Sequence, residues 1–450
     1  MNIFSKIWQR IFPGVKDYPK IGAGKTIALG FQHAFAMACA TILVPLLTGL
    51  DVGVALFAAG LGTIIFHICT GGRMPTFLGI SFAFTTAIAA ITGGGPGVKA
   101  ENAKISEAMG GIIVAGMIYL LFALLIKLLG KGFIDKLFPP VVRGVGIAII
   151  GLNLSSAAIN NIQGFANFTT EYYWSWGIAL FVCLLAIILS CYGKGMLKLS
   201  SIVIALAAGY LVTYLCVKVF GIAPDGLMDM SKMAQHSWFE VPDFVLPTFT
   251  WKAIGTIAPI AIVTCVEHVG DVYANSEVVG RDFAKNPGLH RTMLGDGLAT
   301  IAAGCVGGPA NTTYSENTAV LAVTGNYNPG ALRFAAFVAI AVSFFGKAIG
   351  AIETVPNFVL GGACIVLYGM IASVGLRTLV ENKVDFKSNR NLSIAAVMLV
   401  LAIGGAVWGV EVFSISGIGL GIIAGILLNL ILPKEKDAEK SSASAEDKNE

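Results

Sequence analysis

The sequence has few charged residues for its length. Only 12% of its 450 residues are Asp, Glu, Lys or Arg, against roughly a quarter in an ordinary soluble domain. At the same time 56% are hydrophobic, which is more than one water-soluble core can bury, because single cores stop growing at about 250–300 residues. The composition therefore indicates a protein of the lipid bilayer. Its net charge of +4 is too small and dispersed for nucleic-acid binding.

The motifs of common enzyme classes are missing as well. The sequence contains no G-x-x-x-x-G-K-[ST], no H-E-x-x-H and no G-x-S-x-G, so ATP-driven transport by this chain and the common hydrolase mechanisms lack support. The eight cysteines form no C-x-x-C pair and lie almost all in apolar stretches, which is typical of packing residues. We therefore expect no cofactor and no metal site. No removable signal peptide is apparent, because the first long apolar stretch begins only near Thr26.

Long uncharged intervals cover almost the whole chain. A transmembrane helix needs about 20 mainly apolar residues. Uncharged runs lie at 26–50, 52–72, 74–98, 108–126, 144–170, 172–193, 199–217, 297–315, 354–376, 391–410 and 412–433, with weaker candidates near 250–275, 312–326 and 328–352. These runs predict an all-α polytopic membrane protein with about fourteen segments.

The basic residues predict the orientation. If the N-terminus lies in the cytoplasm, 23 of the 30 Lys and Arg residues fall on the cytoplasmic side, as the positive-inside rule requires. We therefore expect a multi-pass protein of the cytoplasmic membrane with both termini in the cytoplasm. Residues 1–24 would form a cytoplasmic N-terminal segment, 221–249 an extracellular loop, and the polar tail 433–450 a disordered cytoplasmic end.

Two segments, 71–93 and 307–325, interrupt the apolar pattern in the same way. Each starts with Gly-Gly before a proline (Pro75 and Pro309), continues through a polar stretch, and ends an apolar run with Thr-Gly. Their spacing of about half the chain indicates two repeats of seven segments, and an odd number of crossings inverts the second repeat. Matched interrupted helices mark the midplane substrate site of secondary transporters. Alternatively, Gly and Pro only kink two packed helices.

Three carboxyl groups are predicted at membrane depth, where ionisable side chains are costly and usually functional. Glu267 and Asp271 lie one turn apart on one helix face, and Glu316 opens the second half-helix. Because like charges repel in a low dielectric, Glu267 or Asp271 should be protonated or hydrogen-bonded to a donor. The pair is therefore a candidate for exchanging a proton. The alternative for Asp271 is a hydrated, structural position at the cytoplasmic mouth of its helix.

Three further polar residues are candidates of lower rank. His33 is a candidate for proton coupling if it pairs with a buried carboxylate, and otherwise a packing histidine bonded to backbone. We interpret His268 as structural, because it faces a different side of the helix from Glu267. Asp296 is either a partner of the carboxylate site or a helix-end residue.

Five ordered motifs between about residues 20 and 432 resemble those of the nucleobase/ascorbate transporter family, also called nucleobase:cation symporter-2, and within it the uracil–proton symporters of bacteria. The motifs are F-Q-H-A-F-A-M from Phe31, G-I-S-F-A-F from Gly79, V-E-H-V-G-D from Val266, P-G-L-H-R from Pro287 and N-T-T-Y-S-E-N from Asn311. The resemblance implies a 7+7 inverted-repeat fold with core and gate domains, in which short antiparallel strands precede the two half-helices.

The resemblance also implies boundaries for these domains. Spans 1–4 (25–130) and 8–11 (250–352) would form the core domain, and spans 5–7 (131–220) and 12–14 (353–432) the gate domain. A homodimer through the gate domains is a further expectation from the family.

Site residues follow from the same resemblance. Glu267 and Glu316 match glutamates that hydrogen-bond uracil, and Phe82 and Ser315 match positions whose backbone N–H groups meet the base carbonyls. This agrees with the chemistry of uracil, which offers two N–H donors and two C=O acceptors on one ring. The chain departs from the uracil branch at Asp271, where histidine is usual, and at Ser315, where glycine is usual. The aspartate at position 271 resembles the purine branch.

The leading prediction is therefore proton-coupled import of uracil, with xanthine or another oxopurine as the alternative substrate and sodium as the alternative ion. From other classes, a membrane-embedded enzyme would need a nucleophile or metal set, which we do not find. An anion channel would need a continuous pore with basic residues, yet near the half-helices only Arg73 is basic.

Overall fold

The computed structural model describes residues 12–19, 21–130, 132–410 and 413–433. The predicted cytoplasmic N-terminal segment lies partly, and the predicted tail almost wholly, outside the described residues.

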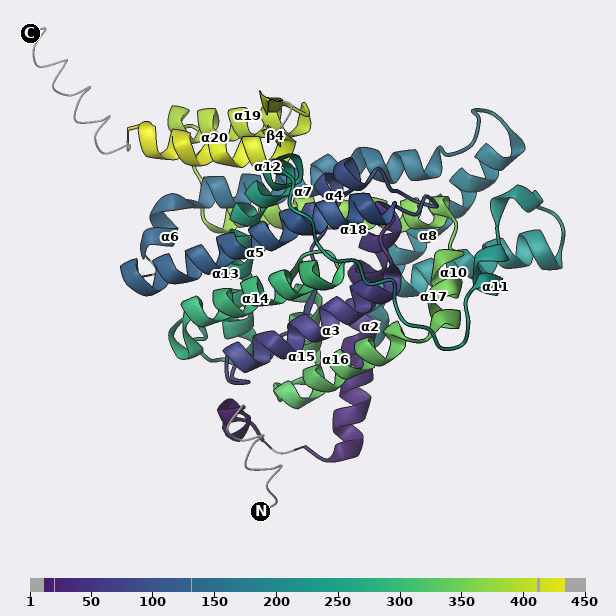
Figure 1. The fold of residues 1–450 in the computed structure, drawn as a ribbon, viewed down its shortest axis with the longest axis horizontal. Helices are drawn as coiled ribbons and strands as arrows, with labels where there is room; N and C mark the ends of the chain where they lie inside the picture. The colour runs from purple at the N-terminus through teal and green to yellow at the C-terminus, as the bar shows by residue number, and fades with distance from the viewer. Residues whose placement is uncertain (1–11, 20, 131, 411–412, 434–450) are drawn as a thin grey trace, which may run out of the picture.

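The described chain contains two successive sets of seven helical segments (Figure 1). The first set is α2 (Ala23–Thr48), α3 (Val52–Cys69), the short α4 (Thr85–Thr92) with a 3-10 turn at Phe82–Phe84, α5 (Asn102–Leu129), α7 (Pro140–Ile162), α8 (Thr170–Tyr192) and α10 (Ser201–Tyr214), continued by a π-helical turn at Leu215–Val219. The second set is α13 (Ala261–Val279), which continues α12 (Trp251–Ile257) and a 3-10 turn at Ala258–Ile260, then α14 (Leu289–Val306), α15 (Ser315–Thr324), α16 (Pro329–Ser343), α18 (Asn357–Glu381), α19 (Asn389–Ile403) and α20 (Gly417–Ile431).

Shorter elements connect these segments. They are 3-10 turns at Pro13–Asp17 and Asp225–Leu227, a π-helical turn at Ala284–Gly288, and the short helices α6 (Gly132–Leu137), α9 (Met196–Leu199), α11 (Ser231–Gln235) and α17 (Gly346–Glu353). Among the described residues eight helices are long and apolar enough to cross a membrane, or nine if α16 and α17, which meet at 83°, are one span. Figure 1 shows α6 near one end of the bundle and α11 and α17 near the opposite end.

The two sets of seven pack in corresponding ways, as an inverted repeat requires. The fifth segments, α7 and α18, pack on each other, and so do the second segments, α3 and α14. The fourth segment of each set packs on the first two of the other, since α5 contacts α12, α13 and α14 and α16 contacts α2 and α3. The sixth segments follow the same rule, because α8 packs on α18 and α19 packs on α7.

Two strands cross between the repeats. β1 (Leu78–Ile80) pairs antiparallel with β2 (Asn311–Thr313) in the register Leu78↔Thr313, Gly79↔Thr312 and Ile80↔Asn311. All six residues are buried, so the ladder satisfies extended backbone where water and lipid could not. The predicted antiparallel strands before the half-helices are therefore confirmed.

Gly79 is required at this crossing. A Cβ atom at this position would lie 2.1 Å from the Tyr314 ring, and the Tyr314 hydroxyl donates to the Ile80 carbonyl at 2.8 Å. Two further backbone bonds extend the ladder, from Ser81 N to Ala310 O and from Tyr314 N to Phe77 O. The close packing of Tyr314 against β1 therefore stabilises the contact between the two repeats.

The half-helices end alike. Gly93 after α4 and Gly325 after α15 both adopt left-handed backbone, with φ of 64° and 60°, a conformation that glycine tolerates best. The paired Thr-Gly endings in the sequence are thus helix C-caps at matching places of the two repeats.

The end of the chain differs from the prediction. Uncharged runs at 391–410 and 412–433 predict two long helices, but α19 ends at Ile403 and α20 begins at Gly417. Between them β3 (Val407–Val410) pairs antiparallel with β4 (Phe413–Ser416). Gly405, with φ of 66°, lies in the turn after α19, and the β-branched and aromatic residues that follow favour a strand.

The helices form two groups by contact. One contains α2, α3, α5, α14 and α16, and the other contains α7, α8, α10, α18, α19 and α20. In Figure 1, α19 and α20 lie along the upper edge and α16 lies near the lower edge. Whether these groups move as core and gate domains stays a prediction.

Candidate functional site

The carboxylate of Asp271 joins α13 to the beginning of α15. One carboxylate oxygen accepts from the Thr313 hydroxyl at 2.6 Å, and the other accepts from the Ser315 hydroxyl at 3.0 Å. Thr313 is the last residue of β2 and Ser315 the first of α15. Asp271 therefore has two donors, which agrees with the expectation that one carboxyl on this helix is protonated or bonded to a donor. The Thr313 contact was not predicted.

Glu267 and Glu316 lie on the two elements that Asp271 joins. Glu267 is one turn earlier on α13 and half-buried, and Glu316 is in the first turn of α15 with an accessible side chain. Ser315 is also accessible. The structure thus brings the Asp271 carboxylate to the N-terminal end of the second half-helix, where backbone N–H groups have no partner within the helix and the helix dipole favours negative charge.

The first half-helix presents Phe82 at the equivalent place. Phe82 lies two residues after the end of β1 and begins the 3-10 turn that leads into α4. Its ring is half-buried and meets the Tyr368 ring of α18 edge to face, with centroids 6.0 Å apart. Because β1 and β2 are antiparallel, both half-helices begin beside the same strand crossing. Tyr368 has no signal in the sequence that distinguishes it from other span aromatics.

His33 contacts a carboxamide in this structure. The Asn317 side-chain nitrogen donates to His33 Nδ1 at 3.2 Å and to the His33 carbonyl at 3.0 Å, and both side chains are buried. Nδ1 is the acceptor here, so the neutral ring carries its proton on Nε2. His33 therefore holds α2 against the residue that follows Glu316, and its role in proton coupling stays a prediction.

His268 and Asp296 form a buried pair beside the carboxylates. His268 Nδ1 lies 2.8 Å from an Asp296 carboxylate oxygen, and neither side chain is exposed. A buried charge is tolerated only when it is paired, so the presence of each of these residues in the interior accounts for the burial of the other. Sequence reasoning treated them separately because they lie on different helices, α13 and α14.

A second carboxamide fixes α13 to both repeats. Asn275 is buried and donates to the Pro75 carbonyl at 2.8 Å and to the Thr318 hydroxyl at 3.1 Å. These bonds hold the C-terminal half of α13 between the segment that leads into β1 and the body of α15. In the described part of the chain, no three His, Cys, Asp or Glu side chains gather to hold a metal ion.

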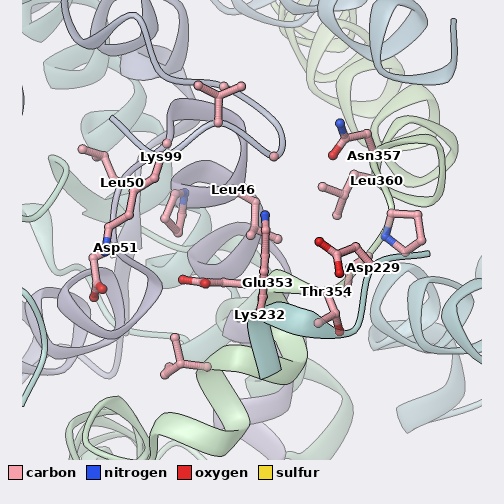
Figure 2. A pocket seen from close by; sticks show the side chains of 18 of the residues that line it. Leu46, Leu50, Asp51, Lys99, Asp229, Lys232, Glu353, Thr354, Asn357 and Leu360 are labelled. Atoms are coloured by element: carbon pink, nitrogen blue, oxygen red, sulfur yellow. The ribbon is translucent and has the colours of Figure 1, made fainter. Parts of the chain in front are cut away.

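A separate cavity of about 920 Å³ opens near α11 and α17 (Figure 2). None of the carboxylates on α13 and α15 lines it. Figure 2 shows Asp51 and Lys99 on one side of this cavity, Asn357 and Leu360 on the other, and Glu353 between them. No motif in the sequence predicted this cavity, because its walls come from five segments that are far apart in the sequence.

Comparison with known proteins gives consistent results. A family model described as a permease family of the xanthine/uracil type matches residues 24–411. The chain is 43% identical to the uracil permease of Bacillus caldolyticus over 438 residues, which cover 95% of this chain and 96% of that protein. It is 39% identical to the uracil permease of Bacillus subtilis strain 168 over 442 residues, covering 96% and 97%. To the uracil permease of Escherichia coli K12 it is 34% identical over 420 residues, covering 93% of each.

Solved structures share the fold. SLC26A9 matches with a TM-score of 0.68 at 13% identity, covering 95% of this chain and 68% of that chain. The transmembrane domain of the cyanobacterial bicarbonate transporter BicA matches with a TM-score of 0.57 at 14% identity, covering 90% and 96%. At these identities the likeness is one of fold, and it confirms the predicted 7+7 inverted repeat.

Proposed function

Because the chain belongs to the xanthine/uracil permease family, the nucleobase/ascorbate transporters, we propose that it imports uracil across the cytoplasmic membrane by proton symport. The family and the relatives are permeases, so the chain is a transporter and not an enzyme. Uracil is the base in the names of the relatives that match almost the whole chain.

The observation that carries the proposal is the contact of the Asp271 carboxylate of α13 with Thr313 and Ser315, at the start of α15 beside the strand crossing. Uracil is planar and offers two N–H donors and two C=O acceptors. In the proposed complex Glu267 and Glu316 accept from the ring N–H groups, and the backbone N–H groups of Phe82 and Ser315 donate to the carbonyls. The half-helices supply these donors without any lysine or arginine, which suits an uncharged base.

Asp271 is the proposed proton carrier, with Glu267 and His33 as the other candidates. A symporter must load a proton on one side and release it on the other, and a carboxyl group at membrane depth can do so when its environment differs between the two states. Asp271 accepts two hydroxyl hydrogen bonds from the other side of the α13–α15 contact. Protonation removes its charge and weakens both bonds, so it changes how the two elements are joined.

Xanthine, or another oxopurine, is the second candidate substrate. One observation favours it: Asp271 and Ser315, the two residues that depart from the uracil branch, are hydrogen-bonded to each other. A changed pair at the start of α15 would alter the shape of the base site.

The proposed orientation places both termini in the cytoplasm. The α6 end of the bundle carries basic residues such as Lys136, Arg281 and Lys285 in its connections, and the α11 end carries Asp225, Asp229 and Asp243. The positive-inside rule assigns the first end to the cytoplasm. We place the chain in the cytoplasmic membrane, in contact with lipid on its outer faces, and a homodimer through the second helix group remains a proposal.

Uptake into proteoliposomes tests the proposal. Purified protein is reconstituted with an alkaline interior, and uptake of radiolabelled uracil is measured with and without the pH gradient and with a sodium gradient in its place. We expect accumulation that needs the pH gradient and competition by excess uracil. Accumulation driven by a sodium gradient alone would show that sodium, and not the proton, is the coupling ion. Stronger competition by xanthine than by uracil would show that the oxopurine is the substrate.

A further inference from the structure

A clamp of three titratable side chains lies at the α11 end of the bundle, away from the carboxylates on α13 and α15. His236 directly follows α11, and its Nδ1 contacts a carboxylate oxygen of Glu240. On the other edge of the ring, Nε2 lies 3.3 Å from a carboxylate oxygen of Glu353. One imidazole thus bridges two acidic groups that lie 113 residues apart in the sequence. We call His236, Glu240 and Glu353 the His236 clamp.

The clamp joins two connections between the helix groups. The first is the segment from α10 to α12, which contains α11, His236 and Glu240. The second is α17, which links α16 of one group to α18 of the other and ends at Glu353. Both connections line the 920 Å³ cavity of Figure 2, to which all three clamp residues contribute. The clamp therefore spans one border of that cavity.

The face of α17 is shaped to receive this segment. A Cβ atom on Gly350 would lie 2.8 Å from the His236 ring and 3.0 Å from the Met233 Cα, and one on Gly346 would lie 2.4 Å from the Ser237 carbonyl. Gly346, Gly350 and Glu353 follow each other at helical spacing on one face. The sequence thus provides two glycines for close approach and one carboxylate to meet the ring.

Other bonds hold the segment in the same place whatever the charge on His236. Lys347 Nζ donates to the Met233 carbonyl at 3.0 Å, and Glu240 N donates to the Phe344 carbonyl at 3.1 Å. These contacts position the ring between its carboxylates in either charge state, so that a charge on the ring adds to the strength with which the two connections are held.

The electrostatics favour the charged ring. Burial lowers the pKa of His236, but hydrogen bonds to Glu240 and Glu353 and their charges outweigh it, so the pKa of His236 lies above its ordinary value of 6.5. The remaining charged groups near it, on α11, α17 and the cavity walls, are Asp229, Lys232, Lys347, Asp51, Lys99 and Asp243. Lys99 is already paired with Asp243 at 2.6 Å.

We propose that the His236 clamp is a proton-binding site, separate from the base site, that fastens the α11 segment to α17 when His236 is protonated. A group whose pKa is raised by its partners in the fastened state stabilises that state fully below pH 6.5 and loses this contribution as the pH rises through the raised pKa. On the proposed orientation the site faces the outside. The external pH then determines how firmly the α11 segment is held to α17 at the edge of the cavity, whichever base is transported.

Hydrogen exchange tests the clamp without any transport. The protein is placed in lipid nanodiscs, and the exchange of a peptide covering residues 229–240 is followed from pH 5.5 to 8.5, corrected for the intrinsic pH dependence. When His236 deprotonates, its hydrogen bonds to the carboxylates lose their charge assistance. The protection of peptide 229–240 against exchange should then fall about tenfold or more. A peptide from α14 in the same sample serves as the internal reference. Protection of 229–240 that does not change with pH would overturn the proposal.

Variants separate charge from packing. His236→Gln and Glu353→Gln should both remove the pH step and leave protection low. Gly350→Ala should lower protection at every pH, because its Cβ displaces the ring. Gly226→Ala, at a glycine of the same segment with nothing within 4 Å of the added Cβ, should behave as the wild type. A pH step that survives in His236→Gln would overturn the proposal, even if Gly350→Ala failed to fold.

Uracil counterflow at equal pH on both sides gives the functional readout, which rests on the proposed function. We expect the wild-type rate to be below its high-pH value while the clamp is fastened and to rise relative to His236→Gln as the pH rises toward 8.5, because α17 joins the two helix groups. Absence of any uracil counterflow in the wild type would contradict the proposed function, while hydrogen exchange would still decide the clamp.

Discussion

Replacing Asp271 by asparagine should uncouple transport from the proton while leaving the base site intact. The carboxylate accepts from Thr313 at 2.6 Å and from Ser315 at 3.0 Å. In the variant the amide oxygen can keep one hydroxyl as donor, and the amide nitrogen can donate to the oxygen of the other. Both contacts persist without charge, so Asp271→Asn imitates the protonated carboxyl group.

The structural change is moderate in size. Hydrogen bonds to charged groups contribute about 1.5–3 kcal/mol and neutral ones about 0.5–1.5 kcal/mol, so two bonds that become neutral weaken the α13–α15 contact by about 2–3 kcal/mol. That loss is shared with the protonated wild type, which is a normal state of the proposed cycle. The bonds that Asn275 makes to Pro75 and Thr318 still hold α13 in place.

The assay compares two kinds of uptake in the same vesicles. A gradient of two pH units stores about 2.7 kcal/mol per proton, enough for about a 100-fold accumulation of base at one proton per base. We expect Asp271→Asn to lose this accumulation and to reach only the outside concentration. Counterflow, which needs binding and movement but no net proton transfer, should stay within about tenfold of the wild type.

A matched control lies on the same helix. Glu277 is an exposed carboxylate two turns further along α13, and Glu277→Gln should keep both accumulation and counterflow. If Asp271→Asn accumulated uracil to the wild-type level, the proton would have to be carried elsewhere, with Glu267 the next candidate.

Three further substitutions test the base site and the strand crossing. Glu267→Gln should weaken uracil binding by about 1.5–3 kcal/mol, and unchanged affinity in calorimetry would remove Glu267 from the site. Glu316→Gln replaces a pure acceptor by a group that also donates, so uracil uptake should fall while xanthine competition rises; normal uracil uptake would show that Glu316 does not read the ring N–H groups. Gly79→Ala places a Cβ 2.1 Å from the Tyr314 ring and should cost about 1–3 kcal/mol or more. A melting temperature as high as that of Gly270→Ala, where nothing lies within 4 Å, would contradict the close packing at the crossing.

The parts of the fold that sequence reasoning reached are those with local signals. Gly-Gly before a proline and a Thr-Gly ending occur together at both half-helices, and their repetition at half the chain length predicts the inverted repeat. The strand pairing followed from family resemblance rather than from the residues themselves. The β3–β4 hairpin was missed because its residues are uncharged and apolar, which suits a span as well as a strand.

The contacts of individual polar side chains were largely out of reach. Hydrophobic periodicity places a residue on a helix face, but it does not say which of several distant polar groups that face will meet. His268 and Asp296 are 28 residues apart on α13 and α14, and Thr313 meets Asp271 only because the strand crossing brings β2 to α13. The His236 clamp joins the predicted loop 221–249 to α17, nearly all of which fell within the predicted span candidate 328–352.

The bonds between α13 and α15 are of two kinds, and the difference between them supports the proposed place of proton coupling. Asn275 binds Thr318 through a carboxamide, which does not titrate. Asp271 binds Thr313 and Ser315 through a carboxylate, which does. Both hydroxyls lie at the junction between β2 and the half-helix whose first turn carries Glu316. In the proposed cycle, a proton on Asp271 therefore weakens the contact at the end of α15 that is proposed to bind the base, while the Asn275 carboxamide keeps the middle of the helix in contact with α13. Proton binding and base binding can then influence each other through one short segment, without movement of the strand crossing.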